Sequence, residues 1–221
     1  MLEQSYNGVK ASCRGAAEGG PERATMGAMT RVRDDQGRRI LEAASGLLSE
    51  EGAAGLSVRR IAAAAGCSTM GLYSRFGGKD GVVDELYAEG FERLCGAMSE
   101  LVDTGDPVAD LVECELSYRR WALAHATHYM VMFGRAVPGF TPSPESRRLA
   151  MEAFGRLVSR VERCVVAGRF PGDPAEIAEV LWGSIHGLVM LELVGIDPLG
   201  RPAEARYRHA LDVLITGFGA A

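Results

Sequence analysis

The stretch SVRRIAAAAGCSTMGLYSRFGGK, residues 57–79, decides the fold of this 221-residue chain. Apolar residues recur at helical spacing over residues 58–65, and Ser57 stands just before them as a candidate N-cap. Gly66 can adopt the positive φ that ends a helix, and Ser68 offers a second N-cap directly afterwards. The stretch therefore predicts two short helices around a turn, which is the helix-turn-helix arrangement that reads DNA.

The second of these helices has one apolar and one polar face. Leu72 and Phe76 lie four residues apart, so both are expected to point inward. The outward face is expected to carry side chains that could reach the major groove: Thr69, Met70, Tyr73 and Ser74, with Arg75 towards the flank. This helix is therefore the predicted recognition helix.

Helices are also expected on both sides of this stretch. An apolar stripe predicts a helix over residues 34–51, ended by Gly52, where the backbone can turn left-handed. After Lys79 the helical period of apolar residues continues through residues 82–94. The helix-turn-helix is therefore expected to be joined to the rest of the chain by a long helix, not by a flexible linker.

The order of these features resembles a known family. The sequence AAGCSTMGLYSRFGGKDGVVDEL, preceded by RRILEAASGLLSEEGAAGLSVRRIA, is similar to the DNA-binding domain of the tetracycline-repressor (TetR) family of bacterial regulators over residues 34–90. A leader helix, a glycine turn, a Leu-Tyr pair, Phe76 and Lys79 follow one another in the family's order. The resemblance implies an all-α fold, with a three-helix DNA-binding domain over residues 31–79.

The resemblance also implies roles for individual residues. Tyr73, Lys79 and Ser57 would bind phosphates, and Arg75 or Arg59 could join them. Thr69, Met70 and Ser74 would face bases, beside the N-cap Ser68. Tyr73, Arg59 and Met70 could instead have packing roles. Arg60 is expected to lie in solvent at the flank of its helix, without a role in DNA binding.

Gly71 departs from the family, whose members often carry a small side chain there. A glycine inside a helix costs on the order of 1 kcal/mol relative to alanine. One hypothesis is that Gly71 lets the backbone approach DNA closely, and the alternative is sequence drift.

The rest of the chain is also expected to be helical. Asp106 and Pro107 should begin a helix that ends near His125, and a short helix is expected over residues 127–133. The loop GRAVPGFTPSPES contains three prolines and is a candidate lid or pocket edge. Further helices are expected over residues 144–167, 174–194 and 203–218, which gives about nine helices in all. No stretch reads as a strand.

The C-terminal half carries a second resemblance. LWGSIHGLVMLEL, with YRRWALAHATHYMVMFGRAVPGF before it, resembles the Trp-x-x-x-His-Gly subgroup of TetR-like C-terminal domains. It implies that residues 80–221 bind an effector and form a homodimer through the last two helices. Candidate pocket residues are aromatic, histidine or methionine side chains, each of which could equally be core: Trp121, Met130, Phe133, Phe154, Trp182, His186 and Met190. For His186 a hydrogen-bonded core position is the favoured alternative.

Composition and charge agree with such a regulator. The net charge is −5, but residues 31–79 hold eight basic and five acidic residues, so this segment carries +3 and the remainder −8. One end of the protein is therefore expected to meet phosphate. The five cysteines form no CxxC pair, and no signal-peptide core or membrane span is present, so a cytoplasmic protein with reduced thiols is expected. Residues 1–30 are expected to be disordered.

The sequence gives little support for metal binding or catalysis. His125 and His128 have metal-ligand spacing, but no third ligand is placed by the sequence, so neither a metal nor a cofactor is expected. No GxSxG, HExxH or phosphate-binding glycine loop occurs, so catalysis is not expected. The sequence thus predicts a ligand-responsive repressor that binds a palindromic operator and responds to a small apolar or amphipathic effector. The alternatives are a ligand-independent DNA-binding or scaffold protein and an enzyme that uses the C-terminal cavity.

Overall fold

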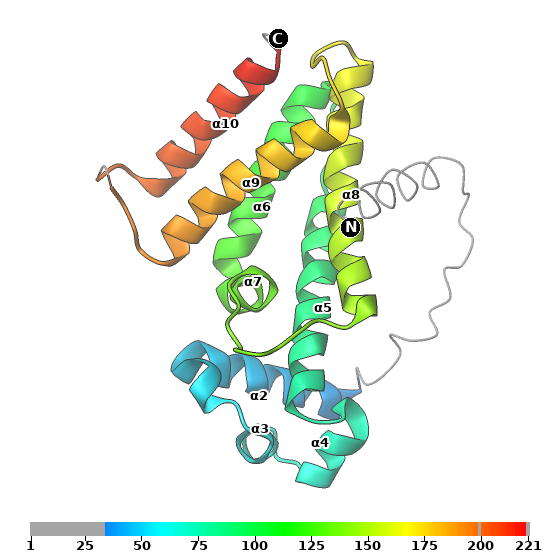
Figure 1. The fold of residues 1–221 in the computed structure, drawn as a ribbon, viewed down its shortest axis with the longest axis vertical. Helices are drawn as coiled ribbons and strands as arrows, with labels where there is room; N and C mark the ends of the chain where they lie inside the picture. Colours follow the sequence, from blue (N-terminus) through cyan, green and yellow to red (C-terminus); the bar gives the residue numbers. More distant parts are fainter. Residues whose placement is uncertain (1–33, 199, 220–221) are drawn as a thin grey trace, which may run out of the picture. The chain divides into compact units, whose positions relative to one another are not determined.

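The computed structural model describes residues 34–198 and 200–219, and its ordered elements are helices (Figure 1). Over this part of the chain there are nine α-helices, one short 3-10 helix and no strand. The predicted all-α class is confirmed. The expectation of disorder for residues 1–30 lies outside the described residues, as does Cys13.

The chain divides into two compact units. The first, here called the HTH unit, comprises residues 34–92 and 127–150, and the second, the C-terminal unit, comprises residues 93–126 and 151–219. The long helices α5 (Lys79–Ser99) and α8 (Pro144–Val166) each contribute several residues to both. These units are defined by packing contacts and not by function. The expected division into a DNA-binding domain up to Lys79 and an effector-binding domain after it therefore stays a prediction.

The HTH unit begins with α2 (Asp35–Glu51), which packs against α3 (Val58–Ala64), and α3 packs in turn against α4 (Thr69–Phe76). The α2 stripe is buried as predicted, with Ile40 and Ala44 fully inaccessible to solvent. Gly52 has a φ of 65° and ends α2 where the sequence predicted. A 3-10 turn (Gly52–Gly55), which the sequence did not predict, then leads towards α3.

The short helix α7 (Ala126–Phe133) packs against the first part of α5 within the HTH unit. The contact is close because α5 has a glycine there: a Cβ at Gly90 would lie 2.5 Å from the Met132 sulfur. His128 Nε2 lies 3.3 Å from a carboxylate oxygen of Glu89, and the Phe91 and Phe133 rings are 5.5 Å apart. From Thr127 onwards, the residues of α7 therefore belong to the HTH unit.

The proline-rich loop after α7 is anchored on α5. The Ser143 N–H donates to Asp84 Oδ1 at 2.8 Å, and the Phe140 ring lies 6.2 Å from that of Tyr87. Ser143 also accepts from the Ser146 N–H at 3.1 Å and so satisfies a free donor in the first turn of α8. A lid role for this loop stays a prediction.

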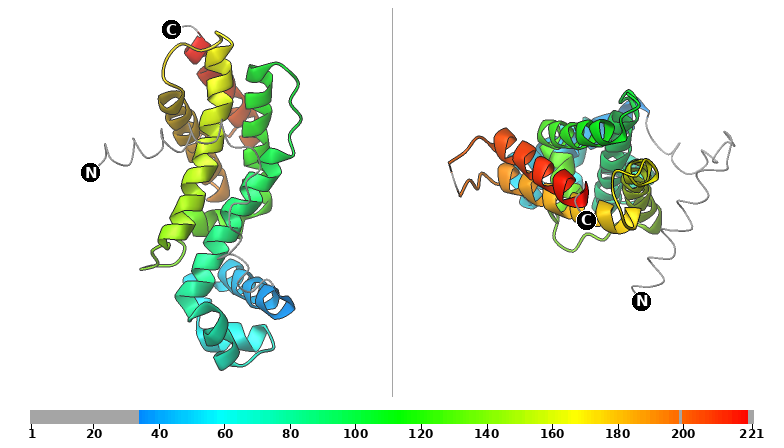
Figure 2. Two further views of the ribbon diagram at one scale, coloured as in Figure 1. Left: turned by 90° about the vertical axis from the view of Figure 1, so that its right-hand side faces the viewer. Right: turned by 90° about the horizontal axis from the view of Figure 1, so that it is seen from above.

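In the C-terminal unit, α6 (Pro107–Ala124) contacts both α9 (Pro174–Leu193) and α10 (Ala203–Gly219), and α10 runs alongside α9 (Figures 1 and 2). Asp106 and Asp173 cap α6 and α9, and each is followed by a proline at the first helical position. These helices begin where the sequence predicted and end within one residue of the predicted positions, because the capping signals are local.

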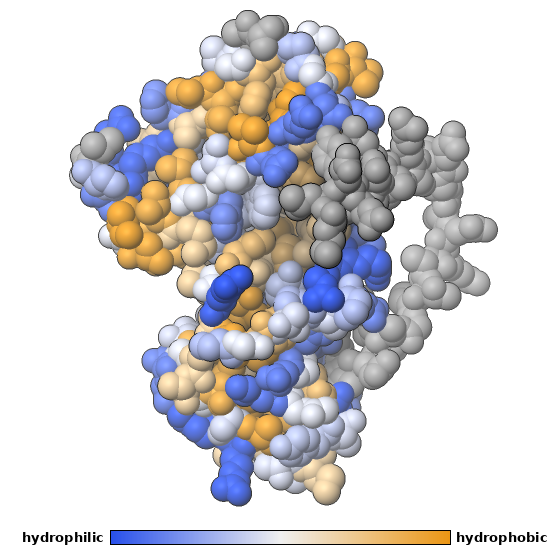
Figure 3. All heavy atoms as spheres, viewed as in Figure 1, coloured by the Kyte–Doolittle hydropathy of each residue, from blue (hydrophilic) through white to orange (hydrophobic). Residues whose placement is uncertain are grey.

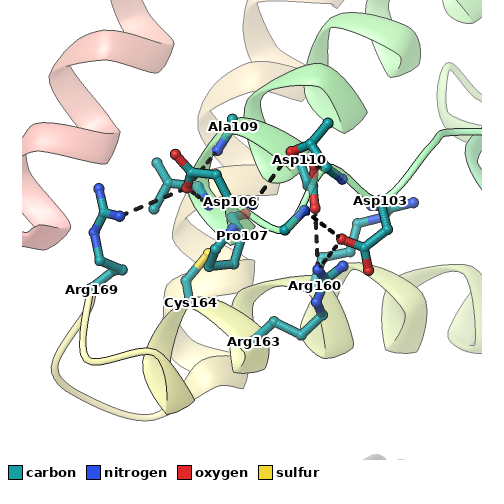
Figure 4. A network of polar contacts seen from close by, with 12 residues as sticks. Asp103, Asp106, Pro107, Ala109, Asp110, Arg160, Arg163, Cys164 and Arg169 are labelled. Carbon is teal, nitrogen blue, oxygen red and sulfur yellow. Dashed lines mark hydrogen bonds and ion pairs between the residues drawn. The ribbon is translucent and has the colours of Figure 1, made fainter.

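The connector from α5 to α6 is held against α8 by a polar network (Figure 4). The buried Asp110 carboxylate accepts from the Thr104 hydroxyl at 2.6 Å and the Thr104 N–H at 3.0 Å. Arg163 Nη2 donates to Asp110 at 3.1 Å and to Asp103 at 2.6 Å. These bonds, those from Thr104 foremost, lower the pKa of Asp110 to about 2. Asp110 is therefore ionised and pins the connector at neutral pH.

A second acid lies inside the C-terminal unit without such support. Glu115 on α6 is 2% exposed, and the Tyr207 hydroxyl donates to its backbone carbonyl at 2.7 Å. Burial raises the pKa of the Glu115 carboxyl to about 8, and the positive charge of Arg160 opposes this shift only in part. Glu115 is therefore expected to be mostly protonated at neutral pH.

This raised pKa makes the stability of the protein depend on pH. Between the unfolded value of 4.5 and the folded value of about 8, only the unfolded chain loses the Glu115 proton, so the free energy of unfolding should fall as pH rises. The contribution is at most about 1.4 kcal/mol per pH unit. Glu115→Gln is neutral at every pH, so it should flatten this slope and be more stable than wild type at about pH 8.

Urea unfolding followed by circular dichroism at about pH 5 and about pH 8 measures both slopes. Glu113→Gln, which changes an exposed carboxylate of the same helix, should keep the wild-type slope. A Glu115→Gln protein whose stability still fell with pH as steeply as wild type would refute the assignment.

Candidate nucleic-acid interface

Caps fix both helices of the helix-turn-helix. The Ser57 hydroxyl accepts from the Arg60 N–H at 3.3 Å, and the Ser68 hydroxyl accepts from the Gly71 N–H at 3.0 Å. Gly66 has a φ of +63° in the turn, and Gly77 has a φ of +71° after α4. Both serines and the turn glycine therefore have the structural roles that the sequence predicted.

The two faces of α4 differ sharply in exposure. Leu72 is completely buried, whereas Phe76 is half-buried and so points inward only in part. The predicted outward residues are all exposed: Thr69, Met70, Tyr73 and Ser74. The orientation of the recognition helix within the HTH unit thus follows the sequence pattern.

Three of these exposed side chains suit contact with base edges. Met70 is 75% exposed, which is unusual for a large apolar residue, and its side chain could contact a thymine methyl group. Ser74 donates its hydroxyl proton to the Gly71 carbonyl at 3.1 Å, so its lone pairs remain to accept from a base amino group. Thr69 at the start of α4 is free to donate or accept.

The basic side chains divide into paired and unpaired groups. Arg60 donates to Glu51 at 2.7 Å, and this contact lowers the pKa of Glu51. Arg75 donates to Asp34 at 2.8 Å. For Arg59 and Lys79, the described part of the chain provides no ion pair. Among the four basic residues of 57–79, these two cations are therefore the ones whose charge is available to phosphate.

Tyr73 packs against the short segment that joins α4 to Lys79. A Cβ at Gly78 would lie 3.4 Å from the Tyr73 ring, which shows that the ring packs on the Gly78 backbone. Tyr73 remains 52% exposed, so packing and phosphate contact are compatible. Lys79 is the first residue of α5, where the helix dipole disfavours a cation. A bound phosphate would offset that unfavourable position.

One residue near the recognition helix was missed by sequence reasoning. The Gln36 amide nitrogen lies 3.9 Å from the position that a Cβ at Gly71 would occupy, so this half-buried side chain adjoins the first turn of α4. The two residues are 35 positions apart, and no local pattern joins them.

The predicted effector residues fall into both units. In the C-terminal unit the Trp182 ring lies 6.0 Å from Phe154 and 5.6 Å from His186, and the Tyr118 hydroxyl lies 3.2 Å from His186 Nδ1. Burial lowers the pKa of His186. These contacts favour the hydrogen-bonded alternative for His186.

The other candidates are more dispersed. Trp121 is 5% exposed and stacks on His125 with ring centroids 5.0 Å apart. Met190 is half-buried on α9, whereas Met130 and Phe133 belong to the HTH unit. The structure therefore brings together Phe154, Trp182 and His186.

An ion-pair cluster at the junction of α6, α9 and α10 was also missed. Arg119 donates to both carboxylate oxygens of Glu192, at 2.9 and 2.7 Å, and its guanidinium lies 5.8 Å from the centre of the Tyr207 ring. Arg119 Nη1 lies 3.9 Å from Glu204. Pairs separated by more than 70 residues leave no signal in the sequence.

The two histidines with metal-ligand spacing do not share one helix. A helix break separates His125, which ends α6, from His128 on α7, as predicted. Residues 34–198 and 200–219 contain no group of three metal-ligating side chains. None of the described helices is long and apolar enough to cross a membrane.

The fold and the exposed α4 define a helix-turn-helix DNA-binding protein with a helical C-terminal body. Two family profiles match it: "Bacterial regulatory proteins, tetR family" over residues 40–86, and "Tetracyclin repressor-like, C-terminal domain" over residues 111–214. The chain belongs to the TetR family of DNA-binding transcriptional regulators.

Curated relatives agree with this assignment. The HTH-type transcriptional regulator Rv1816 of Mycobacterium tuberculosis is 23% identical over 189 residues, which cover 71% of this chain and 80% of the relative. The uncharacterized HTH-type transcriptional regulator YvkB of Bacillus subtilis is 25% identical over 190 residues, which cover 83% of this chain and 97% of the relative.

Solved structures share the fold. A protein of unknown function from Rhodococcus sp. RHA1 has a TM-score of 0.73 at 26% identity and covers 90% of this chain and 100% of its own. The fatty acid degradation regulator FadR from Bacillus halodurans has a TM-score of 0.70 at 16% identity, with coverages of 83% and 96%. The TetR-family regulator PfmR from Thermus thermophilus has a TM-score of 0.62 at 24% identity, with coverages of 80% and 97%.

Lys79→Ala tests whether the unpaired cation at the start of α5 contacts phosphate. The variant should bind every duplex more weakly, and its plot of log affinity against log salt should be shallower by about 0.9 for each bound subunit, or about 1.8 for a dimer, because each subunit releases one fewer counterion. Its thermal stability should not fall, since the side chain is unpaired and sits at the wrong end of the helix dipole. Fluorescence anisotropy over a salt series measures the slope.

Arg120→Ala, which removes an exposed cation from α6 in the other unit, is the matched control and should keep the wild-type slope. A Lys79→Ala slope equal to that of wild type would remove Lys79 from the interface.

Gly71→Ala tests the hypothesis of close backbone approach. An added Cβ would lie 3.4 Å from the Ser68 hydroxyl and 3.9 Å from Gln36, so the free protein can hold it and should gain up to about 1 kcal/mol of helix stability. If the backbone at Gly71 lies close to DNA in the complex, the operator affinity of Gly71→Ala should nevertheless fall, because the added methyl group would occupy that space. Thermal unfolding and anisotropy on one preparation separate the two effects, and affinity unchanged or improved would disprove the hypothesis.

Proposed function

We propose that this protein is a ligand-responsive repressor that binds a palindromic operator as a homodimer. Residues 31–79 would form the DNA-binding domain, and residues 80–221 would bind the effector and form the dimer. The observation that carries the proposal is the exposed polar face of α4, together with two unpaired cations of the same 57–79 stretch, Arg59 and Lys79. That combination suits a DNA groove flanked by phosphates.

Apolar exposure on α9 and α10 supports the dimer. Val180 on α9 is 52% exposed and Val213 on α10 is 56% exposed, and Val194 and Ile196 follow at the end of α9 with similar exposure. Figure 3 shows hydrophobic residues at the surface of this part of the C-terminal unit. A second copy that packed its own α9 and α10 there would remove this apolar surface from water.

A two-fold dimer presents two recognition helices related by the same axis. Its operator should therefore be a near-palindrome with half-site centres about 34 Å apart, which is one turn of duplex. An effector would act by changing that spacing. It must bind the DNA-incompetent state more tightly, typically by about 1–3 kcal/mol.

The effector is expected to be small and apolar or amphipathic. The side chains that meet around Trp182 are aromatic, and α9 itself is apolar along most of its length. One protein of similar fold is named a fatty acid degradation regulator, which agrees with an effector of this kind.

Ligand-independent DNA binding is the second candidate. The contacts of His186 with Tyr118 and of Trp182 with Phe154 favour it, because side chains already packed on one another need no ligand. Selection of bound sequences from random duplex DNA tests both candidates for operator binding. A recovered palindrome supports the dimeric regulator, and the absence of any sequence preference contradicts it.

Adding a series of fatty acids and neutral apolar compounds to the complex with the recovered palindrome then separates the candidates. Loss or gain of affinity supports ligand response, and unchanged affinity across the series supports the ligand-independent alternative.

Val213→Asp tests the proposed dimer surface. A charge at this exposed position should be harmless in a monomer but costly in an apolar interface, so the variant should shift from twice 23.6 kDa towards 23.6 kDa in size-exclusion chromatography with light scattering. Val166→Asp changes an 83% exposed valine of α8 and is the matched control, expected to stay dimeric. A Val213→Asp protein that remained a dimer would place the interface elsewhere.

A further inference from the structure

One carboxylate in the HTH unit serves two helices. Asp34 Oδ1 accepts from the Gly37 N–H at 2.7 Å and caps α2, while Asp34 Oδ2 accepts from Arg75 Nη2 at 2.8 Å. Arg75 lies in the last turn of α4, 41 positions further along the chain. The Arg75 contact first, and the Gly37 contact second, lower the pKa of Asp34.

The Arg75 guanidinium is less accessible than its neighbours. Its side chain is 26% exposed, against 45% for Arg60, the other paired arginine within residues 57–79. The bond to Asp34 raises the pKa of Arg75. A phosphate contact through Arg75 would have to break or share this ion pair, whereas Arg59 and Lys79 carry no such partner among the described residues.

We propose that Arg75 is a positioning residue, which fastens the last turn of α4 to the start of α2 through Asp34, and is not itself a phosphate ligand. The proposal rests on DNA binding by α4.

The need for such a fastening follows from how α4 ends. The start of α4 is held by the Ser68 cap, and its middle is held by the buried Leu72. The end is followed by Gly77 and Gly78, which have φ values of +71° and +136° and no side chains to pack. The ion pair to Asp34 therefore adds a restraint from a distant part of the chain to the last turn of the recognition helix.

An exposed ion pair adds little to global stability, so the effect should appear in DNA binding rather than in the melting temperature. A small tilt of α4 would misplace Met70 and Ser74 against the base edges. Operator affinity should therefore depend on both partners of the ion pair.

A double-mutant cycle on Asp34 and Arg75 tests the proposal. Asp34→Asn removes the charge but keeps an oxygen that can cap α2, since asparagine is as good an N-cap as aspartate. Arg75→Gln removes the guanidinium. The probe is a fluorescein-labelled duplex that carries the palindrome recovered by selection, titrated over a salt series.

Each single variant should lose roughly threefold or more in affinity, and the double variant should be no weaker than either single variant, because both changes break the same contact. The salt slope of Arg75→Gln should equal that of wild type, because no phosphate contact is lost.

Two controls make the result unambiguous. Asp35→Asn removes the neighbouring carboxylate, which pairs with Arg38 and not with α4, so it measures the long-range effect of losing one negative charge near DNA. Lys79→Ala should lower the salt slope and so show that the slope reports phosphate contacts. If wild type itself fails to bind duplex DNA, the family function fails and not only this proposal.

Three results would overturn the proposal. The first is a salt slope of Arg75→Gln reduced by about 0.9 per bound subunit, as for a phosphate ligand. The second is an affinity of Arg75→Gln equal to that of wild type, and the third is tighter binding by Asp34→Asn than by Asp35→Asn. The third result would mean that the ion pair with Asp34 keeps Arg75 from binding phosphate. Thermal unfolding checks that each variant is folded, and if Arg75→Gln is not, the comparison of Asp34→Asn with Asp35→Asn still decides.

Discussion

An eight-residue helix is marginal by itself in water, because nucleation fixes several residues for few hydrogen bonds. The recognition helix α4 has this length, so it depends on its caps and on the burial of Leu72. Ser68 satisfies a free N–H at its start, and Gly77 turns left-handed at its end. These local interactions present four exposed side chains in a fixed orientation, and every functional inference about DNA depends on that orientation.

The same surface shows how charge is distributed for DNA binding. Four basic side chains occur between residues 57 and 79, but Arg60 and Arg75 are held by Glu51 and Asp34. Arg59 and Lys79 are left to meet phosphate. A count of basic residues therefore overstates the charge available to DNA, and the structure separates cations that hold the fold from cations that can bind a ligand.

The C-terminal unit shows the opposite pattern, with polar groups enclosed in an apolar body. Asp110 is buried and strongly hydrogen-bonded, so its pKa falls, whereas Glu115 is buried with less support, and its pKa rises. The bidentate pair of Arg119 with Glu192 joins α6 to α9. These groups fix how the helices that carry the proposed effector and dimer surfaces pack on one another.

The sequence alone determined the helices, the turn of the helix-turn-helix and the exposed face of α4, because caps, glycines and apolar spacing act within a few residues of where they stand. It also indicated the family, because the motif residues follow one another in a short stretch. Only the tertiary structure decided that Asp34 holds Arg75, that Gly90 admits α7, and that His186 meets Tyr118. Each of these contacts joins residues far apart in the chain, and their partners are chosen by packing, which leaves no local pattern to read.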